Sequence, residues 1–193
     1  MPIVVTVHPL IEAAGRHGEL PSWSCLSGPR REHAERVTAL IGEWNLALAV
    51  PEAEQIRRRA AGMLHDALKD VPPDDLRRLV PGEWPDALLH APAAALQLRE
   101  EGIKDEELLL AIQYHSVGHP EFGALGEQLY MADYLDPGRD FGAEGREALR
   151  ARMPDAHDEV LVSVARGRIT ARLEADAPVL EASIQFWNRI IDA

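Results

Sequence analysis

The chain has 193 residues, 46% of them hydrophobic, so it is long enough for a single domain with a well-formed core. Its formal net charge of −12 argues against binding of nucleic acid through the phosphate backbone, but leaves open a nucleotide whose charge metal ions balance. The chain has no recognisable signal peptide and no apolar run near the roughly 18 residues of a membrane span. It also has a single cysteine, which suits a reducing compartment. We therefore expect it to be cytoplasmic and without a membrane contact.

The first 28 residues are predicted to form an N-terminal extension. Glycine, proline and serine interrupt this segment too often for a long helix. From residue 29 to residue 193 the pattern is helical, with few alternating β-branched runs, no repeat and no linker. The sequence therefore predicts one all-α domain over 29–193, preceded by the extension.

The first two predicted helices each carry a candidate ligand. In the first, which begins near Arg30, His33 lies four residues before an apolar stripe and shares its inward face. The second runs from Pro51 to the break at 71–73, with the adjacent pair His65 and Asp66 near its C-terminal end. The stripe of the first helix comprises Val37, Leu40, Ile41, Trp44 and Leu48.

Two more histidines and an aspartate further along the chain also lie within or next to predicted helices. A short helix is predicted at 74–80, and His90 precedes a proline where an alanine-rich helix can begin. Asp105 is the expected N-cap of a helix that ends at His115. Asp133 falls on the apolar face of the helix that follows, where a carboxylate must be paired or bound to a cation.

The C-terminal part is predicted to add three amphipathic helices, at 144–150, 158–173 and 178–191. The buried stripe expected for the last of them comprises Leu180, Ile184, Trp187 and Ile191.

Six candidate ligands thus occur in the order His, His–Asp, His, His, Asp, and three of them fall on apolar faces. Burying each unpaired imidazole or carboxylate costs roughly a few kcal/mol, whereas a shared metal would satisfy them together. Nitrogen and oxygen donors without thiolates suit Fe, Mn, Zn, Co or Ni better than Ca. The alternative is a chance arrangement of histidines in a structural helical domain. The candidates are His33, His65, Asp66, His90, His115 and Asp133.

The order of these residues resembles the HD-domain superfamily of metal-dependent phosphohydrolases. Their flanking residues are similar to the bacterial YqeK-type family of symmetrical diadenosine tetraphosphate hydrolases, over about residues 30–173. Two positions depart from that family, which usually has threonine at Ser116 and glutamate at Asp136; both changes keep a polar group. The matching stretches are Arg30–His33, Ala61–Lys69, Leu89–His90, Ala111–Gly118 and Tyr130–Arg139.

The resemblance implies a helical HD-domain bundle over 29–193 with a dinuclear divalent metal site between core helices. Iron is the first expectation, and Mn, Co, Ni and Zn stay open. A metal-activated water would cleave the central phosphoanhydride of diadenosine tetraphosphate and give two ADP. Asp66 would bridge the metals, the first held also by His33, His65 and Asp133 and the second by His90 and His115.

Basic and polar residues near these ligands are candidate substrate contacts. A guanidinium can bind phosphate oxygens bidentately, whereas an ammonium acts as a point charge. The resemblance makes Asp66 and Lys69 the expected catalytic residues, and Asp70 is a candidate to orient Lys69 or a ligand. The expected substrate contacts are Arg30, Lys69, Ser116 and Arg139.

Two alternatives for the function stay open at this point. One is an HD phosphohydrolase that acts on another nucleotide or phosphate ester, and the other is a non-catalytic module that binds metal and nucleotide. Homodimer formation is open as well, and so is stacking of a nucleotide base on Trp23 or Trp84.

Overall fold

The computed structural model describes residues 7–140 and 142–192. These residues contain ten α-helices, one 3-10 turn and no strand, which confirms the predicted all-α class. No helix among them is both long and apolar enough to cross a membrane. The elements are α1 (Pro9–His17), α2 (Gly28–Ala47), α3 (Glu52–Leu64), α4 (Pro73–Arg77), the 3-10 turn η1 (Asp86–Leu88), α5 (His90–Glu100), α6 (Glu106–Tyr114), α7 (Ala124–Tyr134), α8 (Ala143–Arg150), α9 (His157–Glu174) and α10 (Glu181–Ile191).

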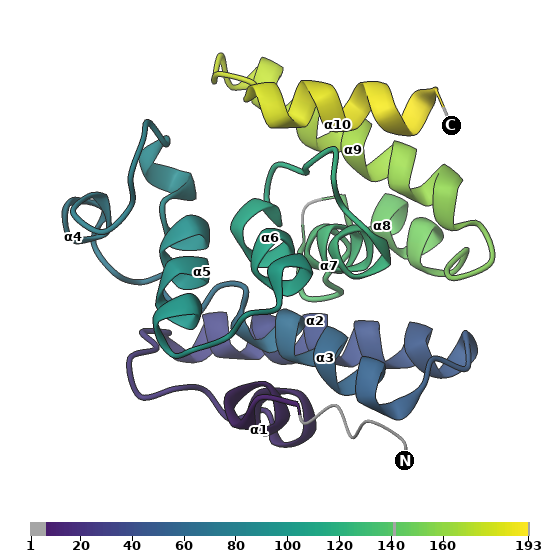
Figure 1. The fold of residues 1–193 in the computed structure, drawn as a ribbon. Coiled ribbons are helices and arrows are strands. Elements are labelled where there is room, and N and C mark those ends of the chain that lie inside the picture. The colour runs from purple at the N-terminus through teal and green to yellow at the C-terminus, as the bar shows by residue number, and fades with distance from the viewer. Residues whose placement is uncertain (1–6, 141, 193) are drawn as a thin grey trace.

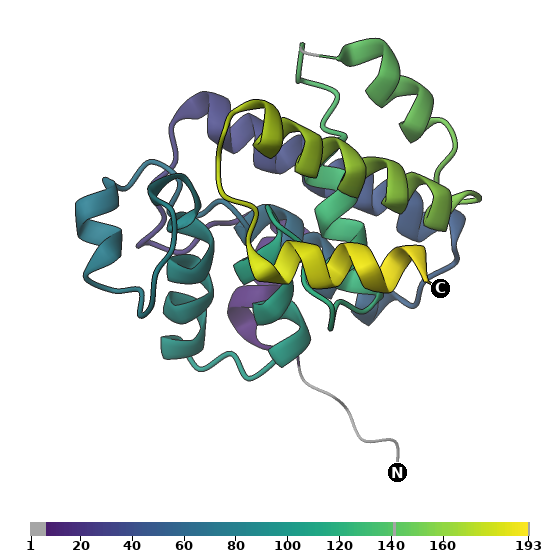
Figure 2. The same ribbon diagram turned by 90° about the horizontal axis from the view of Figure 1, so that it is seen from above.

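The helices stack in layers around the hairpin formed by α2 and α3 (Figure 1). On one side of this hairpin, α1 packs against α3; on the other, α6 and α7 pack against it, with α5 beside α6. The last two helices, α9 and α10, contact each other, and α9 also contacts α7. Figure 2, seen from above, shows the α9–α10 pair lying across the middle of the molecule. The inner helices are therefore covered on both faces, and the polar side chains on their inward faces, such as His33 and Asp133, are buried.

The first 28 residues include a helix, α1, which the sequence pattern did not predict; residues 1–6 lie outside the described part of the chain. The imidazole of His8 caps α1 by accepting a hydrogen bond from the Leu10 amide, and Ile11 is buried in the main core. Gly15 allows the close approach to α3, because a Cβ there would lie 2.1 Å from the carbonyl oxygen of Ile56. The division of the chain at residue 28 stays a prediction.

Several helix ends and faces differ from the sequence expectation. The helix α3 ends at Leu64, and turns occupy residues 65–70, so the His–Asp pair follows the helix. Leu48, predicted to belong to the apolar stripe of the first helix, instead follows the end of α2 and is 51% exposed. The stripe predicted for α10 is wrong at Ile184 and Ile191, which are each 48% exposed, while Trp187 packs against the core as a partly buried residue. The buried residues of α10 are Ser183 and Phe186.

The position of α10 depends on Phe186, which fits against the turn that follows α6. Its ring packs edge-on against Phe122 and Tyr130, with centroid distances of 5.5 and 5.2 Å. Gly118 makes room for the ring, since a Cβ there would lie 2.3 Å from it, and its φ of +83° lies in the left-handed region. The large aromatic ring therefore sets which face of α10 turns inward.

Asp105 is the N-cap of α6, as predicted, and it also pairs with an arginine of α3. Its carboxylate accepts from the Leu108 amide at 3.1 Å, and Arg57 donates to both of its oxygens. Burial alone would raise the pKa of Asp105, but the hydrogen bonds from Arg57 and from backbone amides hold it below its usual value. This stabilisation is therefore present at neutral pH and is lost as the pH falls through that lowered pKa.

We expect Asp105→Ala to lower the free energy of unfolding by about 1–2 kcal/mol, because the cap is lost while Arg57 keeps Glu107 as a partner at 2.7 Å. Urea denaturation at neutral pH measures this loss, and the difference from wild type should shrink in acid. The matched control is Glu106→Ala, which removes an exposed ion pair with Arg99 and should cost below about 0.5 kcal/mol. An equal loss in both variants would contradict the capping role.

Candidate metal-binding active site

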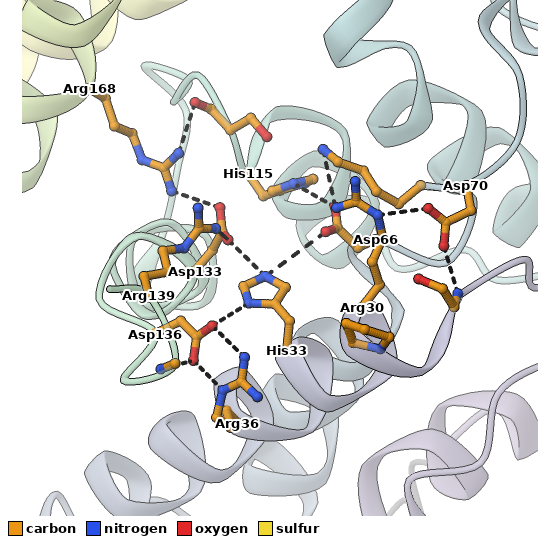
Figure 3. Close-up of a pocket in the computed structure, with 15 residues that line it drawn as sticks. Arg30, His33, Arg36, Asp66, Asp70, His115, Asp133, Asp136, Arg139 and Arg168 are labelled. Atoms are coloured by element: carbon orange, nitrogen blue, oxygen red, sulfur yellow. Dashed lines mark hydrogen bonds and ion pairs between the residues drawn. The ribbon is translucent and has the colours of Figure 1, made fainter. Parts of the chain in front are cut away.

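The structure brings the six predicted ligands together in one buried cluster. Figure 3 shows four of them, His33, Asp66, His115 and Asp133. They come from five separate places in the fold. His33 lies in the first half of α2, His65 and Asp66 directly follow α3, and Asp133 lies in the last turn of α7. The first residue of α5 is His90, and His115 caps the C-terminus of α6. All six side chains belong to residues that are 9% exposed or less.

Asp66 lies at the centre of the cluster, with its two oxygens facing different histidines. Its Oδ2 lies 3.6 Å from His65 Nε2 and 3.9 Å from His33 Nε2. Its Oδ1 lies 3.0 Å from His90 Nε2 and 3.4 Å from His115 Nε2. Although Oδ1 is buried, it makes no hydrogen bond of acceptable geometry within the described chain. One carboxylate is thus shared between two pairs of imidazoles.

Two of these histidines are oriented by backbone carbonyls. With Nδ1 protonated, His65 donates to the Gly62 carbonyl at 2.7 Å and His115 donates to the Ile112 carbonyl at 2.8 Å. Their Nε2 atoms then present lone pairs to the cluster. Burial lowers the pKa of His65 to about 4, and burial also lowers the pKa of His90 and His115. These three imidazoles are therefore neutral near pH 7, the form that binds metals.

His33 is held by carboxylates instead. Its Nε2 lies 3.1 Å from Asp133 Oδ1, and its Nδ1 lies 2.7 Å from Asp136 Oδ2. Burial opposes the charged imidazole, but the hydrogen bonds with Asp133 and Asp136 outweigh it and raise the pKa of His33 to about 9. Asp136 is itself bound bidentately by Arg36, at 2.7 and 3.0 Å. This side of the cluster therefore favours positive charge at His33 Nε2.

The donor atoms fit a divalent metal. Among the residues that the structure describes, two groups have ligand atoms within 4.8 Å of one another and could hold an ion, and they share His65. One group comprises His33, His65 and Asp133; the other comprises His65, Asp66 and His115. The donors are imidazole nitrogens and carboxylate oxygens, which suit several first-row transition metals.

Comparison with known proteins identifies this arrangement of ligands. Residues 30–138, which include all six of them, match the family model for the HD domain. The chain belongs to the HD-domain family. HD domains bind divalent metals, so the buried His–Asp cluster of this HD domain is a metal-binding candidate by family as well as by geometry.

Three curated relatives of this HD protein are named symmetrical bis(5'-nucleosyl)-tetraphosphatase. The relative from Halalkalibacterium halodurans is 29% identical over 83% of this chain and 90% of its own length. The Bacillus subtilis relative is 27% identical over 87% of this chain and 95% of its own length. The third relative, from Staphylococcus aureus, is 27% identical over 77% of this chain and 81% of its own length.

A solved structure is also similar to most of the chain. It is described as a predicted HD superfamily hydrolase involved in NAD metabolism from Clostridium acetobutylicum, with a TM-score of 0.75 and 25% identity. The match covers 86% of this chain and 91% of that one. Together with the curated relatives, this supports an HD-type phosphohydrolase at the level of the family.

A pocket of about 660 Å³ opens onto the His–Asp cluster of the HD domain and is rich in cationic side chains. All four predicted substrate contacts line it. Lys69 Nζ lies 2.9 Å from His90 Nε2, and burial lowers the pKa of this lysine. Asp70 holds Arg30 at 2.7 Å, so the structure pairs Asp70 with Arg30 instead of Lys69. The predicted contacts are Arg30, Lys69, Ser116 and Arg139.

Two further arginines of the pocket were not found from the sequence. Arg168, from α9, donates to Asp133 Oδ2 at 2.8 Å, while Arg139 donates to the other oxygen at 2.7 Å (Figure 3). Arg36 reaches the site through Asp136. Arg168 lies in a helix with several arginines, and no spacing singles it out, because the residues it meets are far away in the sequence.

Proposed function

We propose that the chain is a metal-dependent hydrolase that cleaves diadenosine tetraphosphate symmetrically into two ADP. The observation that carries this proposal is the position of Asp66, one carboxylate between two histidine pairs at the base of a cation-lined pocket. A bridging carboxylate of this kind suits a two-metal site. The names of the three curated relatives support the substrate.

In this proposal, His33, His65 and Asp133 would hold one metal, His90 and His115 would hold the second, and Asp66 would contribute a carboxylate oxygen to each. When bound, the metals supply a hydroxide at neutral pH and polarise the phosphate under attack. Iron is the first choice, and Mn, Co, Ni and Zn also suit the donor set.

The surrounding side chains of the chain bind and orient the polyphosphate. Lys69 places an ammonium beside both His90 and Asp66, at 2.9 and 3.8 Å, where a phosphate next to the metals would meet it. Arg139 has a side chain that is 43% exposed, so it can turn from Asp133 to a phosphate. Arg168 is more buried and has three hydrogen bonds, so it keeps Asp133 in place.

The test is hydrolysis of diadenosine tetraphosphate under anaerobic conditions, with products separated by anion exchange and metal measured on the same sample. ADP as sole product, in proportion to bound metal, supports the proposal. AMP with ATP would contradict symmetrical cleavage. Two bound metals without turnover of this substrate would contradict the substrate assignment. A panel of NAD, nucleoside monophosphates and simple phosphate esters then tests the other phosphohydrolase functions, and no turnover at all would favour a binding module.

We expect Asp136→Asn to weaken metal binding at the position that includes His33 by about 10- to 100-fold, because His33 loses the charged partner of its Nδ1. Calorimetric titration of the metal-free protein with Mn²⁺ measures this change. The control is Asp140→Asn, which changes an exposed carboxylate four residues later. Unchanged affinity in Asp136→Asn would contradict the orienting role.

A further inference from the structure

A second, smaller pocket adjoins the metal-binding pocket on the side of α9. It has a volume of about 250 Å³ and lies between α7, α9 and the connection from α9 to α10. Three residues, Ser116, Arg139 and Arg168, line both pockets. A ligand with its phosphates at the His–Asp cluster can therefore extend into the smaller pocket without leaving the protein surface.

The lining of this smaller pocket, called the side pocket from here on, differs from that of the metal-binding pocket. Aliphatic side chains of Ile169, Val179 and Leu180 form part of its wall, and the ring of Tyr134 forms another. Arg168 links this ring to the His–Asp cluster, because its guanidinium lies 5.4 Å from the centre of the Tyr134 ring and donates to Asp133 Oδ2 at 2.8 Å. Apolar walls with a few polar groups are typical of sites for the organic part of a ligand, whereas cationic walls suit phosphates.

The side pocket also offers flat groups on which a base can stack. The guanidinium of Arg146 lies 4.7 Å from the centre of the Tyr134 ring, and that of Arg168 lies 5.4 Å from it. Nucleobases stack on tyrosine rings and on guanidinium planes with little sequence preference. The side pocket has a volume just below the usual range for small-molecule sites, which suits one base with part of its ribose but not a dinucleotide.

We propose that this side pocket binds one nucleoside of the substrate, while the metal-binding pocket holds the phosphates. This inference rests on the hydrolase function proposed above. The residues from α9 and α10 lie beyond the segment 30–138 that matches the HD domain. The HD core then supplies the hydrolytic centre, and the C-terminal helices supply preference for a nucleotide over a simple phosphate ester.

The two tryptophans considered from the sequence are less well placed for stacking. The indole of Trp23 donates to Glu101 at 3.0 Å, and the ring of Trp84 lies against Tyr114, with centroids 5.4 Å apart. Neither residue is among those that line the metal-binding pocket or the side pocket.

The first test compares binding of ADP and of pyrophosphate, which lacks the nucleoside, by calorimetry on Mn²⁺-loaded protein. Wild type should bind ADP about 10- to 100-fold more tightly. Ile169→Trp, which fills the side pocket, should remove this preference while pyrophosphate still binds. The control is Leu173→Trp, one turn further along α9, where the residue is 62% exposed and outside the pocket lining. No ADP preference in wild type, or a preference that survives Ile169→Trp, would overturn the proposal.

A second test uses wild-type protein alone and so does not depend on how a variant folds. Photolabelling with 8-azidoadenosine diphosphate, followed by peptide mapping, should place the label on Tyr134 or within 169–183. Label confined to the peptides of Trp23 or Trp84 would overturn the proposal. If ADP binds in the side pocket but diadenosine tetraphosphate is not cleaved, the proposed hydrolysis fails while the nucleoside site stands.

Discussion

Asp66→Ala should abolish hydrolysis and empty both candidate metal positions at once. Asp66 directs one oxygen at His33 and His65 and the other at His90 and His115, so its loss removes a ligand from each side. Turnover should fall at least about 10³-fold, because the hydroxide and the charge that stabilises the transition state are lost together. Metal content after dialysis and turnover on the same sample measure both effects.

Two control variants sharpen the Asp66 experiment. His115→Ala leaves the group of His33, His65 and Asp133 intact, so it should reduce bound metal from two equivalents to one. His157→Ala, outside the metal-binding pocket, should leave both metal content and turnover as in wild type. Full turnover in Asp66→Ala would contradict the bridging role.

Gly118→Ala should destabilise the protein by about 2–5 kcal/mol. The left-handed φ of +83° is costly for a residue with a side chain, and a Cβ there would overlap the Phe186 ring. The ring has no room to yield because Phe122 and Tyr130 pack against it. For a chain of this length the melting temperature should fall by about 5–15 °C, measured by circular dichroism.

The matched control for this change is Gly145→Ala in α8. Gly145 has negative φ, and apart from its adjacent residues and the nearby backbone of its own helix no atom lies within 4 Å of its Cβ position. Alanine there should therefore be neutral or stabilise the helix by up to about 1 kcal/mol. A melting temperature for Gly118→Ala within a degree of wild type would show that Phe186 can move and that α10 is not fixed by this contact.

The sequence was most informative where helical periodicity fixes the direction of a side chain. His33 and Asp133 lie on apolar faces, and the structure buries both. The end of α3 was less predictable, because residues 65–70 keep a helix-like pattern while forming turns. The inward face of α10 depends on the fit of Phe186 to Gly118, a contact between residues 68 positions apart, which no local pattern contains.

The sequence predicted the metal ligands of the candidate site, but only some of the residues that hold those ligands in place. Ligand order and flanking residues were sufficient to select the six His and Asp positions. Asp136 was noticed as a departure from the family, but its hydrogen bond to His33 depends on how α2 meets the end of α7. The contact between Arg168 and Asp133 exists because α9 packs over α7, so the sequence gives no reason to choose Arg168 over its neighbouring arginines.

The convergence of five separate segments on one buried His–Asp cluster has a consequence for folding. His33 and Asp133 are 100 residues apart, yet their side chains meet at 3.1 Å. An ion held between such segments acts as a cross-link that exists only in the native chain, so occupancy and thermal resistance should rise together. A free metal concentration 100 times the dissociation constant would add about 2.7 kcal/mol to the free energy of unfolding. Metal supply in the cell would then control how long the protein persists as well as how fast it works.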